Sequence, residues 1–315
     1  MRITPRRVLF SLGFGIATLT ACGGGGVTPG ANAISPSQNA QPAKKSSLLY
    51  VSDSSKFEVF VYTYPQGKLT QTLTGFGDPN GLCVDKKGDV FITDQVDEDI
   101  VEYAHGGSSP IATLSDAEHK PAGCAVNPKN GDLAVTNITN DTTTGAHGPA
   151  SLAIFEPKST KFSELYMDKG FSSFRYAGYD PKGNLYINGY NKNGTKVELA
   201  ELPYGSSTFT NLKVSQTLFG PGGIQWSGKY LAMSDQQTTI YQFSISGSDV
   251  TEHSSTPLQG SSSVYEFQIQ GPKVAATSAG SASLVGIWKY PAGGSPITTI
   301  TGFYEPLGLA ISTGK

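Results

Sequence analysis

The stretch PNGLCVDKKGDVFITD, residues 79–94, decides how this chain folds. It holds two short runs of alternating apolar residues, joined by a turn around Gly88. Such runs on either side of a glycine turn predict a β-hairpin. Because one hairpin cannot bury its own apolar faces, its neighbours in the fold must be sought elsewhere in the sequence.

The pattern returns along the chain. Copies begin at residues 79, 121, 174, 221 and, more weakly, 264, with separations of 42, 53, 47 and 43 residues. Each copy is followed by two more strand-like runs, so one unit holds four strands in about 45 residues, which is typical of a β-propeller blade. The chain also has 38 Gly and 19 Pro and almost no 3.6-residue apolar period, so we expect very few helices.

The two ends of the domain complete one another. Residues 306–312, PLGLAIS, form a first strand with nothing after it, whereas residues 48–73 hold three strands without a first one. We therefore predict an all-β, six-bladed β-propeller of four-stranded antiparallel blades over residues 48–315. Its C-terminal strand joins the N-terminal blade and closes the ring, which removes two free sheet edges.

The same stretch resembles the NHL repeat, whose units run Pro-x-Gly, an apolar strand ending in Asp, a glycine turn and a second apolar strand ending in Asp. The copies at 79 and 121 are close, those at 221 and 306 are partial, and those at 174 and 264 lack the proline. Similar six-bladed propellers include the regucalcin/gluconolactonase family and the NHL modules that bind protein or RNA. The resemblance implies the fold, which these different activities share.

The N-terminus has the features of an export signal. Arg2, Arg6 and Arg7 precede an apolar run, residues 8–19, that is too short to span a bilayer as a mature helix. The following LTAC, residues 19–22, resembles the lipobox of bacterial lipoproteins, which implies a lipid on Cys22. A plain signal peptide with a chance cysteine is the alternative, and export by the general or the twin-arginine route stays open.

We accordingly divide the chain into a lipoprotein signal peptide (1–21), a lipidated cysteine with a flexible linker (22–47) and the propeller (48–315). The linker is rich in Gly, Ser, Pro and Ala and has no aromatic residue, so it has little to bury. Gly23 stands where an aspartate would indicate retention at an inner membrane. We therefore expect an exported protein anchored by its lipid in the bacterial cell envelope, in the outer membrane if there is one.

The charge of the mature chain argues against nucleic acid as a partner. Loss of three arginines with the signal peptide leaves 20 of the 23 basic residues against 25 acidic ones, a net charge near −5. The remaining basic residues are scattered, whereas a phosphate-binding surface needs them clustered. We expect a monomer whose partner is an unknown protein or small-molecule ligand.

In propellers of this kind, the loops that lead into each first strand lie with the loops between the second and third strands at one mouth of the axial channel. The longest of these loops here are residues 138–149 and 189–195, and either may be a binding element or an ordinary surface loop. The positions that follow the repeat proline should lie closest to the axis. They are Asn80, Ala122, Arg175, Gly222, Tyr265 and Leu307.

We predict a ligand-binding site from Asn80, Arg175 and Tyr265, together with Asp78 and Glu305 from the adjoining loops. A guanidinium offers a fork of donors and a tyrosine ring a stacking face, which suits an anionic or aromatic group. Alternatively, Arg175 pairs with a neighbouring acid such as Asp78 and only stiffens the rim.

A lactonase of the regucalcin type would need several oxygen ligands around a divalent cation, and of the six axial positions only Asn80 could serve. We therefore predict no catalytic residue, no metal and no cofactor. The recurring Asp53, Asp94, Asn137 and Asp235, which end the second strands, are interpreted as residues that hydrogen-bond turns.

Cys83 and Cys124 lie in adjacent first strands, with side chains on opposite faces of their blades. Opposite faces meet when blades stack, so a disulfide between blades is geometrically allowed, although both residues could equally be small core residues. The favoured function is a non-catalytic, lipid-anchored propeller that binds a protein, glycan or small ligand on its loop-rich face. The alternatives are a divalent-metal lactonase or hydrolase and a structural scaffold of the envelope.

Overall fold

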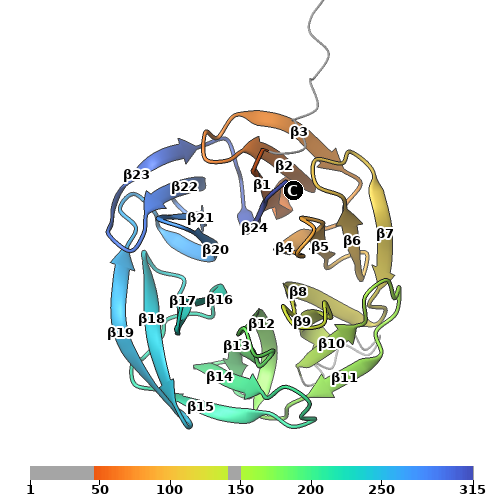
Figure 1. Ribbon diagram of the computed structural model, residues 1–315, viewed down its shortest axis with the longest axis vertical. Helices are drawn as coiled ribbons and strands as arrows, with labels where there is room; N and C mark the ends of the chain where they lie inside the picture. The colour runs from red at the N-terminus through yellow and green to blue at the C-terminus, as the bar shows by residue number, and fades with distance from the viewer. Residues whose placement is uncertain (1–45, 141–149, 315) are drawn as a thin grey trace, which may run out of the picture. The chain divides into compact units, whose positions relative to one another are not determined.

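The computed structural model describes residues 46–140 and 150–314 (Figure 1). The predicted signal peptide, Cys22 and nearly all of the predicted linker lie outside the described residues, as does most of the 138–149 loop. Within the described ranges, no helix is long and apolar enough to cross a membrane. The helical structure described is a single 3-10 turn, η1 (Ser54–Lys56), which confirms the expectation of very few helices.

Four of the sheets contain four strands each, all paired antiparallel. The first has the order β24-β1-β2-β3, with the bounds Pro306–Ser312, Leu48–Asp53, Glu58–Thr63 and Leu69–Thr74. The second, β4-β5-β6-β7, has the bounds Pro79–Val84, Val90–Asp94, Asp99–Tyr103 and Pro110–Ser115. The third, β8-β9-β10-β11, has the bounds His119–Val126, Leu133–Asn140, Ser151–Phe155 and Glu164–Met167. The fourth, β20-β21-β22-β23, has the bounds Ser263–Gln270, Lys273–Ala279, Leu284–Lys289 and Gly293–Ile300.

The fifth sheet has eight strands and consists of two antiparallel sets of four. The set β12 to β15 has the bounds Phe171–Tyr179, Leu185–Asn191, Val197–Leu202 and Thr210–Val214. The set β16 to β19 has the bounds Ile224–Ser227, Tyr230–Ser234, Thr239–Ser246 and Asp249–Pro257. A short parallel pairing of the outer strands, Lys213 with Asp249 and Val214 with Val250, joins the two sets.

The arrangement is that of a β-propeller (Figure 1). The first strand of each antiparallel set lies nearest the centre, and these inner strands are β4, β8, β12, β16, β20 and β24. The predicted pairing of the two ends is present, because β24 lies antiparallel to β1 with Ser312 opposite Leu48 and Ala310 opposite Tyr50. The all-β fold with four-stranded antiparallel blades is therefore confirmed.

The Pro-x-Gly of the repeat forms a β-bulge. In five inner strands the register shifts at this point, and the inner strand holds one residue more than its partner. In β4, for example, Pro79 lies opposite Asp94 but Leu82 lies opposite Ile92. The bulge leaves the carbonyl of the residue after the proline position free of its own sheet ladder, so it can accept a hydrogen bond from another blade.

The carbonyls of these five residues, and that of Gly222 just before β16, each accept a hydrogen bond from the second strand of the preceding blade. The donors are small polar side chains next to or near the end of that strand, and the bonds run around the whole ring. They are Ser52 to Asn80 (2.5 Å), Thr93 to Ala122 (3.0 Å), Thr136 to Arg175 (2.8 Å), Asn188 to Gly222 (2.8 Å), Ser234 to Tyr265 (3.5 Å) and Thr277 to Leu307 (3.1 Å). The donors are buried, so these bonds satisfy polar groups that would otherwise be costly inside the domain.

The residues that end the second strands hydrogen-bond turns, as predicted, in three cases. Asp94 accepts the backbone N–H groups of Gly77 and Asp78, both at 2.7 Å, and Asp53 accepts those of Tyr304 and Glu305. Asp235 accepts the N–H of Gln237. Asn137 differs, because neither of its buried side-chain polar atoms has a hydrogen-bond partner.

The apolar core is divided among the blade interfaces. Six clusters of buried side chains are present in the described domain, each drawn from two neighbouring sets of strands. One cluster, for example, joins Ile92 and Val90 of β5 to Tyr50 of β1 and Ala310 of β24. Burial between blades supplies the main stabilisation of such a ring, since no single blade can cover both of its faces.

Candidate functional site in the axial channel

The predicted residues Asn80, Arg175 and Tyr265 lie in or beside the bulges of β4, β12 and β20. We call this end of the channel the loop-side mouth. All three side chains are partly buried, and the three backbone carbonyls accept the hydrogen bonds between blades described above. The structure thus places the three residues at equivalent positions around the ring, each with its backbone held by the preceding blade.

Arg175 has no ionic partner. It is the only arginine after residue 7, and none of the ion pairs between described residues includes it. Its Nε is buried without a hydrogen-bond partner. The alternative in which Arg175 pairs with an acid such as Asp78 is therefore wrong for the described residues; the charges that act on Asp78 are those of Asp94 and Glu305.

Tyr176 links Arg175 to the opposite side of the channel. Burial is the main effect that raises the pKa of the Tyr176 phenol, Glu266 raises it further, and Arg175 lowers it. Tyr265 contributes a smaller increase. Arg175, Tyr265 and Glu266 therefore all lie within electrostatic range of one buried hydroxyl, although they come from two different blades.

Asp78 and Glu305 lie together, apart from Arg175, beside β4 and β24. Burial is the main effect that raises the pKa of Asp78 to about 6, and the nearby Asp94 and Glu305 carboxylates raise it further. Glu305 is exposed, and its Oε2 accepts the hydroxyls of Ser54 (3.1 Å) and Ser55 (2.9 Å). Asp78, Asp94 and Glu305 thus make this side of the rim acidic.

The oxygen ligands of a regucalcin-type metal site do not fit this arrangement. Among the described residues, no group of three or more His, Cys, Asp or Glu side chains is placed to hold a metal ion. The Glu305 carboxylate already accepts hydrogen bonds from two serine hydroxyls. The bulge that holds Asn80 contains no Asp or Glu that could serve as a second oxygen ligand beside it. No catalytic step is therefore derived through a metal.

A cavity of about 290 Å³ lies between the inner strands. We call it the axial pocket. Its lining comes from every inner strand and extends to Pro128, in the turn after β8, and Trp226, near the end of β16. Apolar residue types such as Leu82, Ile224 and Phe267 predominate in the lining, but the surface that they and their backbone expose to the cavity is more polar than apolar. The axial pocket is thus nearer the hairpin turns than the loops on which the predicted site was placed.

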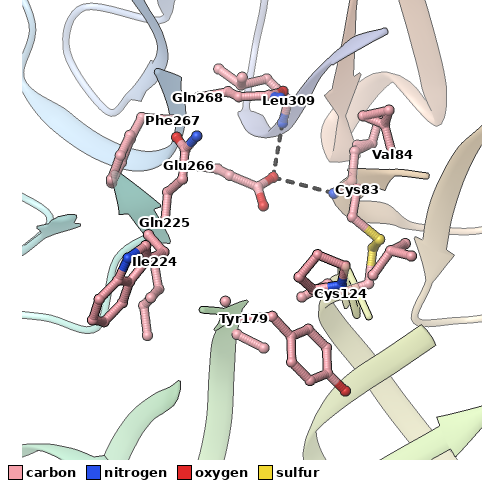
Figure 2. Close-up of a pocket in the computed structure, with 17 residues that line it drawn as sticks. Cys83, Val84, Cys124, Tyr179, Ile224, Gln225, Glu266, Phe267, Gln268 and Leu309 are labelled. Atoms are coloured by element: carbon pink, nitrogen blue, oxygen red, sulfur yellow. Dashed lines mark hydrogen bonds between the residues drawn. A yellow bond between two sulfur atoms is a disulfide. The ribbon is translucent and has the colours of Figure 1, made fainter. Parts of the chain in front are cut away.

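Glu266 of β20 is the carboxyl group in this pocket (Figure 2). Its Oε2 accepts two backbone N–H groups from different blades, that of Leu309 in β24 at 2.9 Å and that of Leu82 in β4 at 3.2 Å. Figure 2 shows the second carboxyl oxygen directed into the pocket. Burial raises the pKa of Glu266 to about 8, against the two N–H groups, which favour the ionised form.

Sequence analysis missed Glu266 because it took the residue after the proline as the axial position. The wall of the axial pocket comes instead from residues farther along the inner strands, and in β20 Glu266 is the first of them. At the position equivalent to Glu266, β4, β8 and β24 have Gly81, Gly123 and Gly308, and Gly223 stands just before β16; none of these glycines lines the pocket. A Cβ at Gly81 would lie 2.4 Å from the Ala122 carbonyl oxygen, so glycine is required by close approach. A glutamate at a position where four copies have glycine was the signal available in the sequence.

Cys83 and Cys124 are joined by a disulfide, with 5.6 Å between their Cα atoms, and both line the axial pocket. Stacked sheets usually lie about 10 Å apart, but the inner strands of a ring converge toward the axis. The close contact of Gly81 with Ala122 and Gly123 shows this convergence between β4 and β8. The two cysteines also belong to the apolar cluster between these blades, so the two alternatives for them are compatible.

Two glutamines make further links across the wall of the pocket. Gln225 of β16 donates from Nε2 to the Ile269 carbonyl (3.1 Å) and accepts the Ile269 N–H on Oε1 (2.6 Å). Gln268 of β20 accepts the N–H of Ile311 in β24 on Oε1. Both amides thereby bridge neighbouring blades. Glu266 is the residue of the wall whose side chain can carry a charge, and one of its carboxyl oxygens accepts no hydrogen bond from a described residue.

Comparisons with known proteins bear on the fold. Neither a protein-family model nor a curated protein matches the sequence. Among solved structures, a chain in the crystal structure of a nidogen/laminin complex is similar, with a TM-score of 0.67 and 14% identity over 85% of this chain and 99% of that one. A protein of unknown function from Bacteroides caccae is also similar, with a TM-score of 0.65 and 11% identity over 85% and 99% of the two chains. At these identities the likeness concerns the fold alone, and with the strand arrangement above it shows that the chain is a β-propeller.

Proposed function

We propose that this chain is an exported, lipid-anchored six-bladed β-propeller of the NHL type that binds a carboxylate-bearing ligand at its loop-side mouth without catalysing a reaction. The blade number is supported by the six hydrogen bonds that join each inner strand to the preceding blade and by the six core clusters. The eight-stranded sheet then corresponds to two blades whose outer strands touch.

The cellular address is supported by the sequence alone. Three arginines, an apolar run and the LTAC ending occur in the order that a lipoprotein signal needs, and Cys22 would carry the lipid. An oxidising compartment outside the cytoplasm is also where a disulfide such as Cys83–Cys124 would persist. We propose attachment to the bacterial envelope, in the outer membrane where there is one.

Arg175 is the observation that carries the binding function. A guanidinium whose Nε is buried and unpaired has lost water without gaining a partner, which is unfavourable unless a ligand supplies the missing acceptor. One guanidinium matches one carboxylate, which it can bind through two parallel hydrogen bonds. Tyr265, within electrostatic range of the same hydroxyl as Arg175, would offer its ring to the body of the ligand.

The test is calorimetric titration of the full-length chain in detergent with glucuronate, succinate and, as a neutral match, glucose. We expect the two carboxylates to bind and glucose to fail. Arg175→Gln should weaken carboxylate binding by at least tenfold. Lys192→Gln, which removes one exposed positive charge from the same rim, should leave it unchanged. Equal binding by glucose, equal losses in the two variants, or no binding of either carboxylate would refute the proposal.

A protein partner is the second candidate, favoured by exposed apolar side chains on the loop-side rim. Phe219 is 75% exposed, Tyr304 is 71% exposed and Val96 is 60% exposed, and these three are the most exposed large hydrophobic side chains of the described residues. One structurally similar chain was solved as part of a nidogen/laminin complex. A photo-cross-linking residue at 219 or 304 should then capture one discrete partner in cells, whereas the same residue at 297, on β23, should capture none.

A further inference from the structure

We propose that the axial pocket is a second, separate binding site, which takes a small organic amine with its ammonium group against the free oxygen of Glu266 and its apolar body along the wall. This site uses none of the side chains assigned to the loop-side mouth, although Glu266 follows Tyr265 directly in the bulge of β20. It therefore stands or falls independently of the function proposed above.

The position of the Glu266 carboxyl group is fixed before any ligand arrives. Its Oε2 is held between β24 and β4 by the N–H groups of Leu309 (2.9 Å) and Leu82 (3.2 Å). No described residue donates to Oε1, which Figure 2 shows directed into the cavity. Because the carboxyl group is anchored at one oxygen, the other is aimed at a ligand with little freedom left to lose on binding.

The charge of the wall favours a cation over an anion. No Lys, Arg or His side chain lines the axial pocket. The Gln225 amide is already bound to Ile269 at both ends, and Gln268 Oε1 is bound to Ile311. Aliphatic residues such as Leu82, Val84 and Ile224, together with Phe267 and Trp226, make up much of the remaining lining, beside exposed polar surface. An anionic ligand would find no counter-charge here.

Few other titratable groups face Glu266. From the strands packed against it, β4 contributes Leu82, β24 contributes Leu309 and β16 contributes Ile224, none of which ionises, and Cys83 is in the disulfide. From β12, the Tyr176 phenol lies within electrostatic range, and Tyr179 lines the pocket. Burial raises the pKa of both phenols, so both stay neutral through the physiological range and only Glu266 changes charge.

Binding of an ammonium ion then releases a proton. With a pKa of about 8, the Glu266 carboxyl group is largely neutral at pH 7, and it must give up its proton to form the ion pair. The affinity for an amine should therefore rise about tenfold per pH unit below pH 8 and level off between pH 8 and 9, where the amine is still charged. A neutral ligand that accepts a hydrogen bond from the protonated acid would show the opposite trend, with weaker binding above pH 8.

The experiment is a calorimetric titration of the full-length chain in detergent, at several pH values from 6 to 9, with butylamine, benzylamine and phenethylamine. The matched probes are butanol, benzyl alcohol and 2-phenylethanol, which have the same body without the charge. We expect at least one amine to bind, with an affinity that rises with pH as described and exceeds that of its alcohol at least tenfold at pH 8.

Two variants separate the site from a general effect of charge. Glu266→Gln keeps an acceptor for the two N–H groups and should abolish both the preference for amine and its pH dependence. Glu252→Gln, on the exposed face of β19, should change neither. If Glu266→Gln does not fold, the amine-to-alcohol ratio and the pH trend of the unmodified chain still decide. Failure of all three amines, equal binding of the alcohols, or affinity that falls with rising pH would overturn the proposal.

Discussion

At the loop-side mouth the distinctive charge is Arg175, whose Nε is buried without a partner, whereas in the axial pocket it is Glu266, of which one oxygen is held by two backbone N–H groups. Arg175 occupies a bulge that five of the inner strands share, and only its side chain is special. Glu266 departs from the repeat itself, because four of the other inner strands have glycine there. Arg175 therefore adds a charged side chain to a conserved backbone arrangement within the chain. Glu266 instead takes the place of a glycine of the repeat and hydrogen-bonds β20 to β4 and β24.

The pH dependence of stability is the strongest way to test this difference. The pKa of Glu266 is raised to about 8 in the folded protein from about 4.5, so the folded state holds a proton that the unfolded state has lost between these values. The free energy of unfolding should accordingly fall as pH rises from about 4.5 to 8, by up to about 1.4 kcal/mol per pH unit, and become level above pH 8.

Chemical denaturation at pH 5, 6.5 and 8 measures this effect. Glu266→Gln should flatten the decline, and Glu252→Gln should retain it. A slope that survives in Glu266→Gln would mean that other carboxyl groups, such as Asp78 with its pKa of about 6, dominate the titration instead.

The disulfide in the wall of the axial pocket should have the next largest effect. Cys83 and Cys124 are 41 residues apart, and the bond restricts the unfolded chain as well as joining β4 to β8. Replacing both by serine should lower the free energy of unfolding by about 2–4 kcal/mol. Denaturation curves with and without a reducing agent provide the check, since reduction should destabilise the natural chain and leave the double variant unaffected. If the natural chain and the double variant have equal free energies of unfolding, the disulfide does not stabilise the fold.

Arg175 should have the smallest effect on stability, in contrast to Glu266. Because its guanidinium makes no ion pair with a described residue, Arg175→Gln should change the free energy of unfolding by no more than about 0.5 kcal/mol. The melting temperature of the unliganded variant measures this. A loss of several kcal/mol would show that Arg175 supports the scaffold after all and would weaken its assignment to ligand binding.

Much of the fold could be predicted because the repeat records it directly. The recurrence of PNGLCVDKKGDVFITD indicated the hairpin, its spacing indicated the blade, and the incomplete units at the two ends indicated that β24 pairs with β1. The parallel contact between β15 and β19 had no such signal, since it involves two short pairs in outer strands whose sequences do not recur.

The candidate sites were harder to predict, because they depend on where a side chain points and on what it fails to contact. The bulge of β20 is accompanied by Glu266, and not Tyr265, in the wall of the axial pocket, and periodicity alone does not reveal such a placement. That no described residue forms an ion pair with Arg175 depends on where all of the surrounding acidic side chains lie, which the sequence around Arg175 does not reveal. For Cys83 and Cys124, the alternation of side chains along a strand predicted that the two side chains point to opposite faces of their blades. The short distance between β4 and β8 could not be predicted in this way, because it follows from the convergence of the inner strands toward the axis.

The antiparallel contact of β24 with β1 means that the two ends of the domain are neighbours. A circularly permuted chain, in which a short peptide joins residue 314 to residue 46 and new termini open in an exposed turn such as the one around Gly247, would keep every strand pairing and all of the hydrogen bonds between blades. The position of the chain termini in the ring is thus independent of the strand pairings and hydrogen bonds that stabilise it.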